Sequence, residues 1–433
     1  MTQSDTSRKS QNPRALTAVT VPPGMGGVLK LASVIGPALD GTGPAIVPMA
    51  DSPEFIVKQT LEALRPNDPK FPLESNDIAI VSATSGSTGT PKGVLLSRQA
   101  LEASATAFGN RFGINNRWVV SMPAHRIAGI MVLVRSWFHN SPFEIDPSVG
   151  GARTFESAAF AATTLRAVRK SAADGRALMV SLVPTQIARL LESGSVGIEA
   201  LQSYDLVLSG AATTPQPMLN KMRELGIKVS VSYGMTETCG GCVFDGRPLD
   251  DVKVSLGTKD DVEPGRVTIS GPVTASGYRL RPDLDAVSFI SGQVQTHDVG
   301  KLDSSGLLHI LGRLDDVVNV GGVNVALSAV ESLIRHHPAI EDVAVIDLQD
   351  ELWGSIPIAY VVTRYHVADT SNLISEIQST IRDQISRAAV PRTVQFVASL
   401  PMLDSGKIDR ISLRMQAANE VNQKVFPHPG SKR

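Results

Sequence analysis

Short apolar runs rich in β-branched residues alternate with helix-like segments over much of this chain. The strand-like runs are residues 78–82, 118–122, 178–183, 205–209 and 228–232. Segments with apolar residues at helical spacing follow two of them, at Ile127, Ile130, Met131 and Val134 and at Ile187, Leu190 and Leu191. This alternation predicts helices layered on a largely parallel sheet. Ligands of such folds gather at the loops beyond the strand ends.

The pattern of predicted secondary structure changes twice after this region. Short strands and Gly/Pro turns from 252 to 310 predict a small β-rich subdomain. Beyond Arg313, helices near 327–336 and 373–387 alternate with strands near 343–346, 358–362 and 394–397. The predicted fold class is therefore α/β. A large N-terminal domain of layered α/β subdomains plus the β-rich subdomain, residues 1–314, precedes a smaller α+β domain, residues 315–433.

The charge balance argues against nucleic acid or an anionic membrane as a general partner. The chain of 433 residues has 41 basic and 42 acidic residues and a formal net charge of -1. No signal peptide is expected, and the apolar segments are broken before the ~20 residues that a membrane span needs. A homo-oligomer is left open.

The only two cysteines, Cys239 and Cys242, fit a reducing cytoplasm, where we expect the protein to be located. Their Cys-Gly-Gly-Cys spacing is compatible with a redox pair or half of a metal site. The simpler interpretation is two small residues that line a wall, because no second Cys or His pair lies nearby in the sequence.

A loop of hydroxyl, glycine and lysine residues follows the first predicted strand. Residues 84–94 read Thr-Ser-Gly-Ser-Thr-Gly-Thr-Pro-Lys-Gly-Val. Glycines let backbone N–H groups curl around an anion, and the hydroxyls and the lysine add donors and positive charge. A Walker A loop is excluded, since Lys92 lies between Pro91 and Gly93 instead of in a Gly-Lys-Ser/Thr end. Alone, such a loop is usually a flexible turn.

Four further clusters suit parts of one nucleotide site. They are Tyr-Gly-Met-Thr-Glu-Thr at 233–238, His-Asp-Val-Gly at 297–300, Arg-Leu-Asp-Asp at 313–316 and Gly-Lys-Ile-Asp-Arg at 406–410. Together with the loop, and in this order, they resemble the acyl-adenylate-forming superfamily of AMP-dependent synthetases and ligases. That superfamily includes acyl-CoA synthetases, luciferases and peptide-synthetase adenylation domains. The resemblance covers roughly residues 78–410.

The resemblance implies an ATP site with Mg2+ as cofactor. The loop residues that would hold the β- and γ-phosphates are Thr84, Ser85, Gly86, Ser87, Thr88, Gly89 and Lys92. Tyr233 would pack on adenine beside Gly210 and Ala211. Thr236 would contact the α-phosphate, and Glu237 would help to place Mg2+. Asp298 and Arg313 would hold the ribose.

The resemblance also implies two half-reactions. In the first, a carboxylate attacks the α-phosphate, and Lys407 would act with Thr236 and Glu237 to neutralise the anions that meet there. In the second, the thiol of coenzyme A displaces AMP. The smaller domain would rotate about a hinge at Asp315, and Gly321 and Gly322 would then help to form the thiol tunnel.

Shorter motifs indicate which carboxylic acid the chain would activate. Only 83 residues precede Thr84, so we expect an abridged N-terminal subdomain. Pro-Ala-His-Arg-Ile-Ala-Gly at 123–129, Ser-Leu-Val-Pro-Thr-Gln at 181–186 and the two-cysteine motif resemble o-succinylbenzoate–CoA ligases of menaquinone (vitamin K2) biosynthesis. The acyl-site candidates are His125, Arg126, Ser181 and Gly234. The second carboxylate of such an acid needs donors or a cation, and Arg126, Arg135 or the Ser181 region would meet it.

Several alternatives stay open. Arg126 and Arg135 also fit a solvated helix face, and His125 also fits an uncharged, packed gate. The acid could instead be an aryl or medium-chain acid, or the acceptor a separate carrier protein. A non-catalytic binder fits least, because Lys407, Glu237 and Asp298 occur together.

Overall fold

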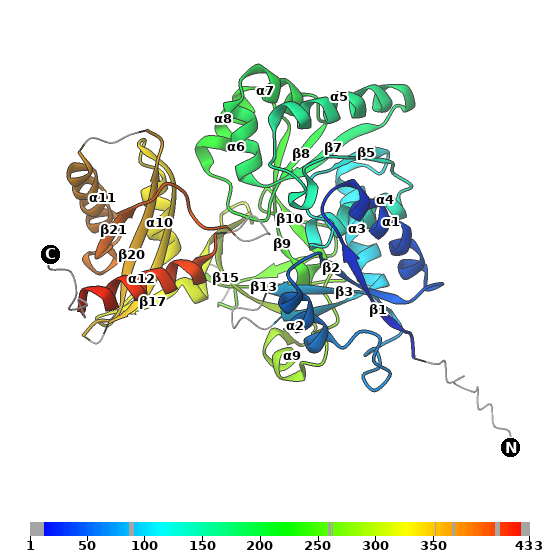
Figure 1. Ribbon diagram of the computed structural model, residues 1–433, viewed down its shortest axis with the longest axis horizontal. Coiled ribbons are helices and arrows are strands. Elements are labelled where there is room, and N and C mark those ends of the chain that lie inside the picture. Colours follow the sequence, from blue (N-terminus) through cyan, green and yellow to red (C-terminus); the bar gives the residue numbers. More distant parts are fainter. Residues whose placement is uncertain are drawn as a thin grey trace, which may run out of the picture. The chain divides into compact units, whose positions relative to one another are not determined.

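The computed structural model describes residues 13–85, 91–258, 261, 263–350, 352–365, 369–402 and 408–425 (Figure 1). The chain divides into two compact units, Met1–Val254 with Ile269–Gln295 and Ser255–Thr268 with Thr296–Arg433. These units group residues 296–314 with the C-terminal part, whereas the predicted domain boundary lies at 314. That boundary concerns which parts move, and it stays a prediction.

A four-stranded sheet begins the first unit. Its strands, in spatial order, are β1 (Leu16–Val21), β2 (Ala45–Ala50), β3 (Ile78–Ser85) and β4 (Pro91–Ser97). The first three are parallel, and β3 and β4 form an antiparallel hairpin. Helices α1 (Met25–Asp40) and α2 (Glu54–Leu64) connect the parallel strands. Buried Leu16, Val47, Leu64, Ile78 and Leu95 belong to one apolar cluster on this sheet.

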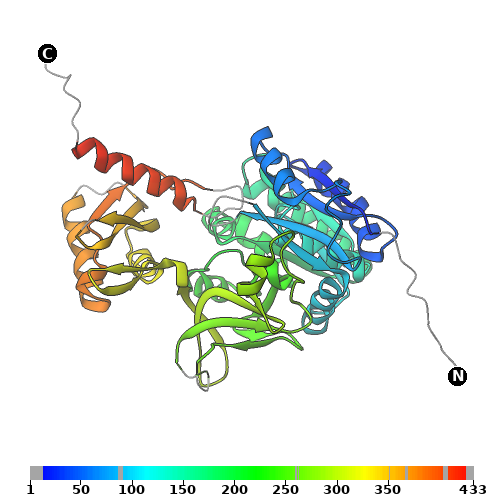
Figure 2. The same cartoon turned by 90° about the horizontal axis from the view of Figure 1, so that it is seen from below.

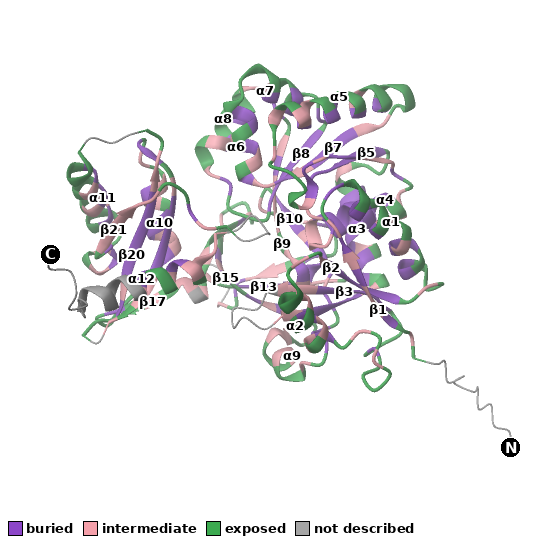
Figure 3. Ribbon diagram, in the orientation of Figure 1, coloured by how far each residue is buried: buried purple, intermediate pink, exposed green. Residues whose placement is uncertain are grey.

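A seven-stranded sheet forms the centre of the first unit, in the order β11-β10-β9-β8-β7-β5-β6. The parallel strands are β5 (Asn116–Val120), β6 (Phe143–Ile145), β7 (Ala177–Leu182), β8 (Leu206–Ser209) and β9 (Val229–Met235). Antiparallel β10 (Gly240–Phe244) and β11 (Arg247–Pro248) extend it. All residues of β5 and β8 are buried (Figure 3). The predicted parallel sheet is confirmed, although β9 runs further than the apolar pattern indicated.

Helices cover both faces of this sheet. The apolar cluster on one face includes residues of α5 (Ser157–Asp174), α6 (Pro184–Glu192), α7 (Ser195–Gln202) and α8 (Gln216–Glu224). On the opposite side, Trp118 of β5 contacts Phe108 of α3 (Arg98–Phe112), which packs against α4 (Ile127–Phe138). Neighbouring Val119 belongs to the first face, as the alternation of side chains along a strand requires. The helices predicted around 127–134 and 187–191 are α4 and α6.

A third sheet confirms the predicted β-rich segment. Its order is β12 (Lys253–Ser255), β13 (Gly265–Ser270), β15 (Gln293–Leu302) and β14 (Phe289–Ile290), and β16 (Leu308–Arg313) pairs with β15. The short helix α9 (Pro282–Ser288) precedes β14. The boundaries between the two compact units fall within β12, β13 and β15.

The second unit contains a further sheet in the order β18-β17-β20-β19, with β21 beside β20. The strands are β17 (Val317–Val320), β18 (Val323–Ala326), β19 (Ile340–Asp350), β20 (Gly354–Thr363) and β21 (Thr393–Phe396). One face packs on α10 (Leu327–Arg335) and α11 (Thr370–Gln384), and the other on α12 (Arg410–Val425) (Figures 1 and 2). The predicted helices and strands of this part are confirmed. Among the described residues, no helix is long and apolar enough to cross a membrane.

Candidate functional site

Four neighbouring parallel strands bring predicted site residues to one edge of the seven-stranded sheet. Because β9, β8, β7 and β5 are parallel, their carboxyl ends lie at the same edge. The predicted residues at or just beyond these ends are Tyr233 and Thr236 (β9), Gly210 and Ala211 (β8), Ser181 (β7), and His125 and Arg126 (after β5). In open α/β sheets, ligands bind beyond the carboxyl ends of the strands, at this edge. The nucleotide and acyl candidates of this unit therefore occupy adjacent strand ends.

The hairpin of β3 and β4 carries the predicted phosphate loop. Thr84 pairs in register with Lys92, and its hydroxyl donates to the Lys92 carbonyl oxygen across 3.4 Å. Ser85 pairs with Pro91. Gly86, Ser87, Thr88 and Gly89 lie outside the described residues. The two ends of the predicted loop are therefore held together by strand pairing.

Tyr278 links the lysine of this loop to the predicted metal ligand. Its ring centroid lies 5.7 Å from Nζ of Lys92. Its hydroxyl donates a hydrogen bond to Oε1 of Glu237 across 2.8 Å. Burial, together with the negative charge of Glu237, raises the pKa of Tyr278, so the hydroxyl keeps the proton that it donates. No sequence motif singled out Tyr278, since a Gly-Tyr pair in a turn-rich segment is common.

The hairpin of β9 and β10 orders the tyrosine motif. Thr238 closes the short 3-10 turn Thr236–Thr238, because its hydroxyl accepts from the Met235 N–H across 3.0 Å. A Cβ added at Gly234 would lie 2.1 Å from the Gly240 carbonyl oxygen. Gly234 is predicted to line the acyl site. The close approach of β10 requires a glycine there whether or not a substrate does.

His125 and Arg126 precede α4, and Arg126 is its N-terminal capping residue. Burial, then the positive charge of Arg126, lowers the pKa of His125 to about 4. Within the described part of the chain, Nε2 of His125 is buried and has no hydrogen-bond partner. A neutral imidazole at this position favours the packed gate over a charged ligand for the second carboxylate.

Arg135 fits neither of the two interpretations given to it. Its residue is only 4% exposed, so it is not on a solvated helix face. Its guanidinium carbon lies 4.0 Å from the ring centroid of Phe108 and 5.8 Å from that of Trp118. Burial lowers the pKa of Arg135 to about 9. Arg135 lies in the last turn of α4, whereas the acyl candidates lie near its first turn, so it is a core cation held by aromatic faces.

The two cysteines of the Cys-Gly-Gly-Cys motif are free and buried. Burial raises the pKa of Cys239, and it raises the pKa of Cys242 to about 12. Among the described residues, no group of three or more His, Cys, Asp and Glu side chains could hold a metal ion. These thiols are protonated side chains inside the fold.

In the second unit, Asp298 and Arg313 are cross-strand partners. They pair in register between β15 and β16, and Nη1 of Arg313 lies 3.7 Å from Oδ1 of Asp298. The Asp298 side chain is 12% exposed and that of Arg313 is 51% exposed. A buried carboxylate beside a more exposed guanidinium can bind a sugar diol from one side. The sequence interval between the two residues is thus bridged by a single hairpin.

Asp315 lies in the 3-10 turn Leu314–Asp316, which leads into β17. Gly321 and Gly322 form the turn between β17 and β18, with φ angles of 58° and 89°. A Cβ on Gly321 would lie 2.4 Å from the ring of Trp353, and the Gly321 N–H donates to the Trp353 carbonyl oxygen across 2.8 Å. Both glycines are therefore required by the backbone itself.

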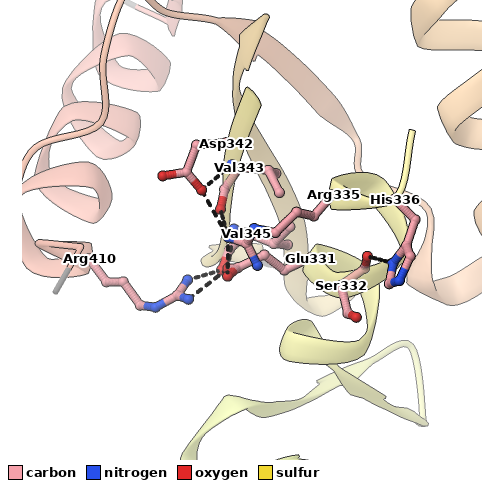
Figure 4. A network of polar contacts seen from close by, with 8 residues as sticks. All are labelled: Glu331, Ser332, Arg335, His336, Asp342, Val343, Val345 and Arg410. Carbon is pink, nitrogen blue, oxygen red and sulfur yellow. Dashed lines mark hydrogen bonds and ion pairs between the residues drawn. The ribbon is translucent and has the colours of Figure 1, made fainter. Parts of the chain in front are cut away.

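Lys407 lies outside the described residues, but both flanks of its segment are fixed. Met402 and Ile408 form an antiparallel bridge, and the Asp409 N–H donates to the Pro401 carbonyl oxygen across 2.8 Å. Arg410, at the start of α12, donates to Oε2 of Glu331 on α10 across 2.6 Å and to the Val345 carbonyl oxygen across 2.8 Å (Figure 4). The same carboxylate accepts from Nη2 of Arg335 across 3.1 Å. The described residues on both sides of 403–407 thus contact the second unit's own core.

Residues 35–279 match the family described as AMP-binding enzyme, and residues 329–407 match the AMP-binding enzyme C-terminal domain. The first match alone covers more than half of the chain.

The chain belongs to the AMP-binding enzyme family.

Two relatives with the same activity in their names cover most of this chain. A probable 2-succinylbenzoate–CoA ligase of Mycobacterium tuberculosis is 35% identical over 413 residues, which is 94% of this chain and 100% of the relative. A 2-succinylbenzoate–CoA ligase of Bacillus subtilis is 28% identical over 367 residues, 81% of this chain and 71% of the relative.

Solved structures share the fold. The o-succinylbenzoate CoA synthetase of Bacillus subtilis, in complex with its acyl-adenylate intermediate, has a TM-score of 0.70 at 23% identity, covering 93% of this chain and 88% of that one. ATP-bound MatB of Rhodopseudomonas palustris has a TM-score of 0.78 at 21% identity, covering 95% and 90%. The predicted family, fold class and AMP-forming ligase activity are confirmed. The roles of individual residues stay predictions.

The residues of this AMP-binding enzyme fit a Mg2+ ion shared with phosphates. Glu237 uses Oε1 to accept from Tyr278, and an ionised carboxylate has about four lone-pair sites, so acceptor capacity remains for a hard cation. Lys92, whose ammonium lies over the Tyr278 ring, brings a positive charge to the same tyrosine.

Proposed function

We propose that this chain is a 2-succinylbenzoate–CoA ligase. It forms acyl-AMP and pyrophosphate from the acid and ATP, and then acyl-CoA and AMP from that intermediate and coenzyme A. The observation that carries this proposal is the end-to-end similarity to the mycobacterial relative of that name, at 35% identity. The adjacent strand ends for nucleotide and acid give the two reactants a common edge.

Residue roles in the first half-reaction follow from charge. The acid carboxylate and the α-phosphate are both anions, so their approach requires positive groups fixed in advance. Lys407 supplies one beside the α-phosphate, and Thr236 donates to the same phosphate. Glu237 would hold Mg2+, which would supply positive charge to the phosphate oxygens. Lys92 and the loop from Thr84 to Gly89 hold the leaving pyrophosphate, and no general base is needed because the acid is already ionised.

Other residues place the nucleoside. Tyr233 packs on adenine beside Gly210 and Ala211. Asp298, with Arg313, holds the ribose hydroxyls. Asp298 and Arg313 belong to the second unit.

We assign the second carboxylate of the acid to Arg126. A guanidinium is charged at neutral pH, whereas the lowered pKa of His125 leaves that imidazole neutral. Ser181, at the end of β7, adds a hydroxyl to the same edge of the sheet. An anion that enters a partly buried site is stabilised by a charged donor far more than by a neutral one.

The second half-reaction uses a different arrangement of the chain. Rotation at Asp315 withdraws Lys407 and brings the turn of Gly321 and Gly322 forward to form part of the thiol tunnel. A cytoplasmic location, the absence of a nucleic-acid partner and the oligomeric state stay predictions.

A panel of acids tests the proposal. The full chain is incubated with MgATP and 2-succinylbenzoate, benzoate or octanoate, with and without coenzyme A, and pyrophosphate and acyl-CoA are measured. Release of pyrophosphate with 2-succinylbenzoate, but not with the two monocarboxylates, supports the proposal. Preference for benzoate or octanoate would replace it with an aryl- or medium-chain ligase, and turnover that never uses coenzyme A would indicate a carrier protein as acceptor.

A further inference from the structure

Tyr278 lies on a segment of the first unit that contacts both the strand of Lys92 and the turn of Glu237, the two groups predicted to face MgATP. The segment runs antiparallel to β4. The Leu95 N–H donates to the Gly277 carbonyl oxygen across 2.8 Å, and the Arg279 N–H donates to the Gly93 carbonyl oxygen across 2.7 Å. At its other end, the Ala275 N–H donates to the Glu237 carbonyl oxygen across 2.8 Å. One stretch of backbone therefore holds the strand of Lys92 and the turn of Glu237.

The side chain next to Tyr278 fixes this segment. The guanidinium of Arg279 is fully buried and donates to the carbonyl oxygens of Leu64 and Pro72 across 2.8 and 2.9 Å, and to Oε2 of Glu74 across 2.9 Å. The Tyr278 N–H donates to Oδ1 of Asp285 across 2.7 Å. Tyr278 is therefore held from its own backbone, from its neighbour and from the strand beside it.

The ring and the hydroxyl of Tyr278 serve two different partners. The residue is 7% exposed, and its ring packs edge-on against Phe289 with 5.3 Å between centroids. The ring lies beneath the ammonium of Lys92, and the hydroxyl donates to Glu237. A packed ring with a fixed hydroxyl can orient a carboxylate that a free glutamate side chain would leave in several rotamers.

We propose that Tyr278 is a positioning residue of the MgATP site, whose hydroxyl orients Glu237 for Mg2+ and whose ring holds the ammonium of Lys92 toward the phosphates. This inference rests on the proposed function, because it takes Glu237 and Lys92 as groups that face MgATP. Tyr278 itself touches neither metal nor phosphate in this assignment. Its effect passes through the two side chains.

Calorimetric titration of the full chain with ATP, in Mg2+ and in a chelator, tests the hydroxyl. We expect Tyr278→Phe to weaken MgATP binding about tenfold, since the lost bond is to a charged group, and to leave the binding of Mg2+-free ATP unchanged. Tyr204→Phe is the matched control, because it removes a buried hydroxyl that bonds to Thr164 across 2.8 Å. Equal MgATP affinity of wild type and Tyr278→Phe, or an equal loss with and without Mg2+, would overturn the assignment.

A double-mutant cycle separates positioning from a general structural role. If the hydroxyl acts through Glu237, Tyr278→Phe has no further effect on MgATP affinity in a Glu237→Gln background. A loss of the same size in both backgrounds contradicts the proposal. Tyr278→Leu, which also removes the ring, is expected to weaken Mg2+-free ATP binding about threefold through Lys92. Equal affinities of Tyr278→Leu and Tyr278→Phe for Mg2+-free ATP would contradict the role proposed for the ring.

These measurements are independent of the acid. MgATP binding is measured without any carboxylic acid, so a chain that binds MgATP but releases no pyrophosphate with 2-succinylbenzoate would refute the proposed substrate and leave the role of Tyr278 intact. Thermal unfolding midpoints of each variant, close to that of wild type, establish that the compared proteins are folded.

Discussion

Arg410 donates a hydrogen bond across 2.6 Å to the buried carboxylate of Glu331, and this contact joins the start of α12 to α10. The Glu331 side chain is 10% exposed, and it also accepts from the Val345 N–H across 3.1 Å. The pair therefore holds the start of α12 on the core of the second unit (Figure 4).

Removal of Glu331 should be costly. Glu331→Ala leaves two guanidinium groups without their shared acceptor, and we expect a loss of about 3 kcal/mol in the free energy of unfolding, measured with urea. Glu376→Gln is the control, since the Glu376 side chain is 51% exposed in its pair with His337 and should cost less than about 1 kcal/mol. Similar losses for both variants would show that the Glu331 contact contributes no more to the free energy of unfolding than an exposed ion pair does.

Lys407→Ala should separate the two half-reactions. Loss of one pre-placed donor typically lowers the rate about 10²- to 10³-fold, so acid-dependent exchange between ATP and pyrophosphate should fall by that order. Thioester formation from supplied acyl-AMP and coenzyme A should change much less. Near-normal exchange in the variant would refute the role assigned to Lys407.

Arg126→Gln should raise the KM for 2-succinylbenzoate by about tenfold or more, because a charged donor to its second carboxylate is lost. The KM for ATP should stay unchanged. Arg98→Gln provides the control, as the Arg98 side chain is 47% exposed at the start of α3. Steady-state kinetics with both substrates measure this, and an equal rise in both KM values would argue against the assignment.

His125 should make stability fall as the pH decreases. Its pKa is about 4 in the folded chain and 6.5 in an unperturbed side chain, so the unfolded chain binds the proton first. The stabilising difference is fully present above about 6.5 and disappears as the pH falls toward about 4. The thermal unfolding midpoint of His125→Gln should therefore decrease less than that of wild type across this range. Parallel curves would contradict the neutral imidazole, and His336→Gln, at the exposed residue directly after α10, serves as the control.

Gly234→Ala should disturb the fold before it disturbs the substrate. The added methyl would lie 2.1 Å from the Gly240 carbonyl oxygen, and β9 and β10 must separate to admit it. We expect a lower thermal unfolding midpoint in the absence of any ligand. Gly26→Ala, in α1 with nothing within 4 Å of its added Cβ, should leave the midpoint unchanged or slightly higher. An unfolding midpoint of Gly234→Ala equal to that of wild type would show that β10 can move away from β9 at little cost in stability.

Several elements of this fold were predictable because their patterns are local. β-Branched runs gave β5, β7 and β8, and helical spacing gave α4 and α6. The gathering of site residues at one sheet edge also followed, since parallel strands share that edge.

Two contacts were not predictable, because they depend on residues distant in sequence. Tyr278 meets Glu237 only through the pairing of its segment with β4, which no periodicity encodes. Arg135 was expected near substrate or solvent, because arginine is seldom buried without a carboxylate. The aromatic faces of Phe108 and Trp118, which come from two other elements, provide its partner.

The order of strands in the central sheet bears on how such enzymes diversify. The proposed nucleotide contacts of this sheet lie after β8 and β9, and the proposed contacts to the acid lie mainly after β5 and at the end of β7, on the other side of the β7–β8 boundary. Changes in the segments that follow β5 and β7 can therefore alter which acid is accepted without touching the segments that meet adenine. The choice of acid and the binding of ATP are thus assigned to separate halves of one sheet edge, so either half can be altered by substitution on its own.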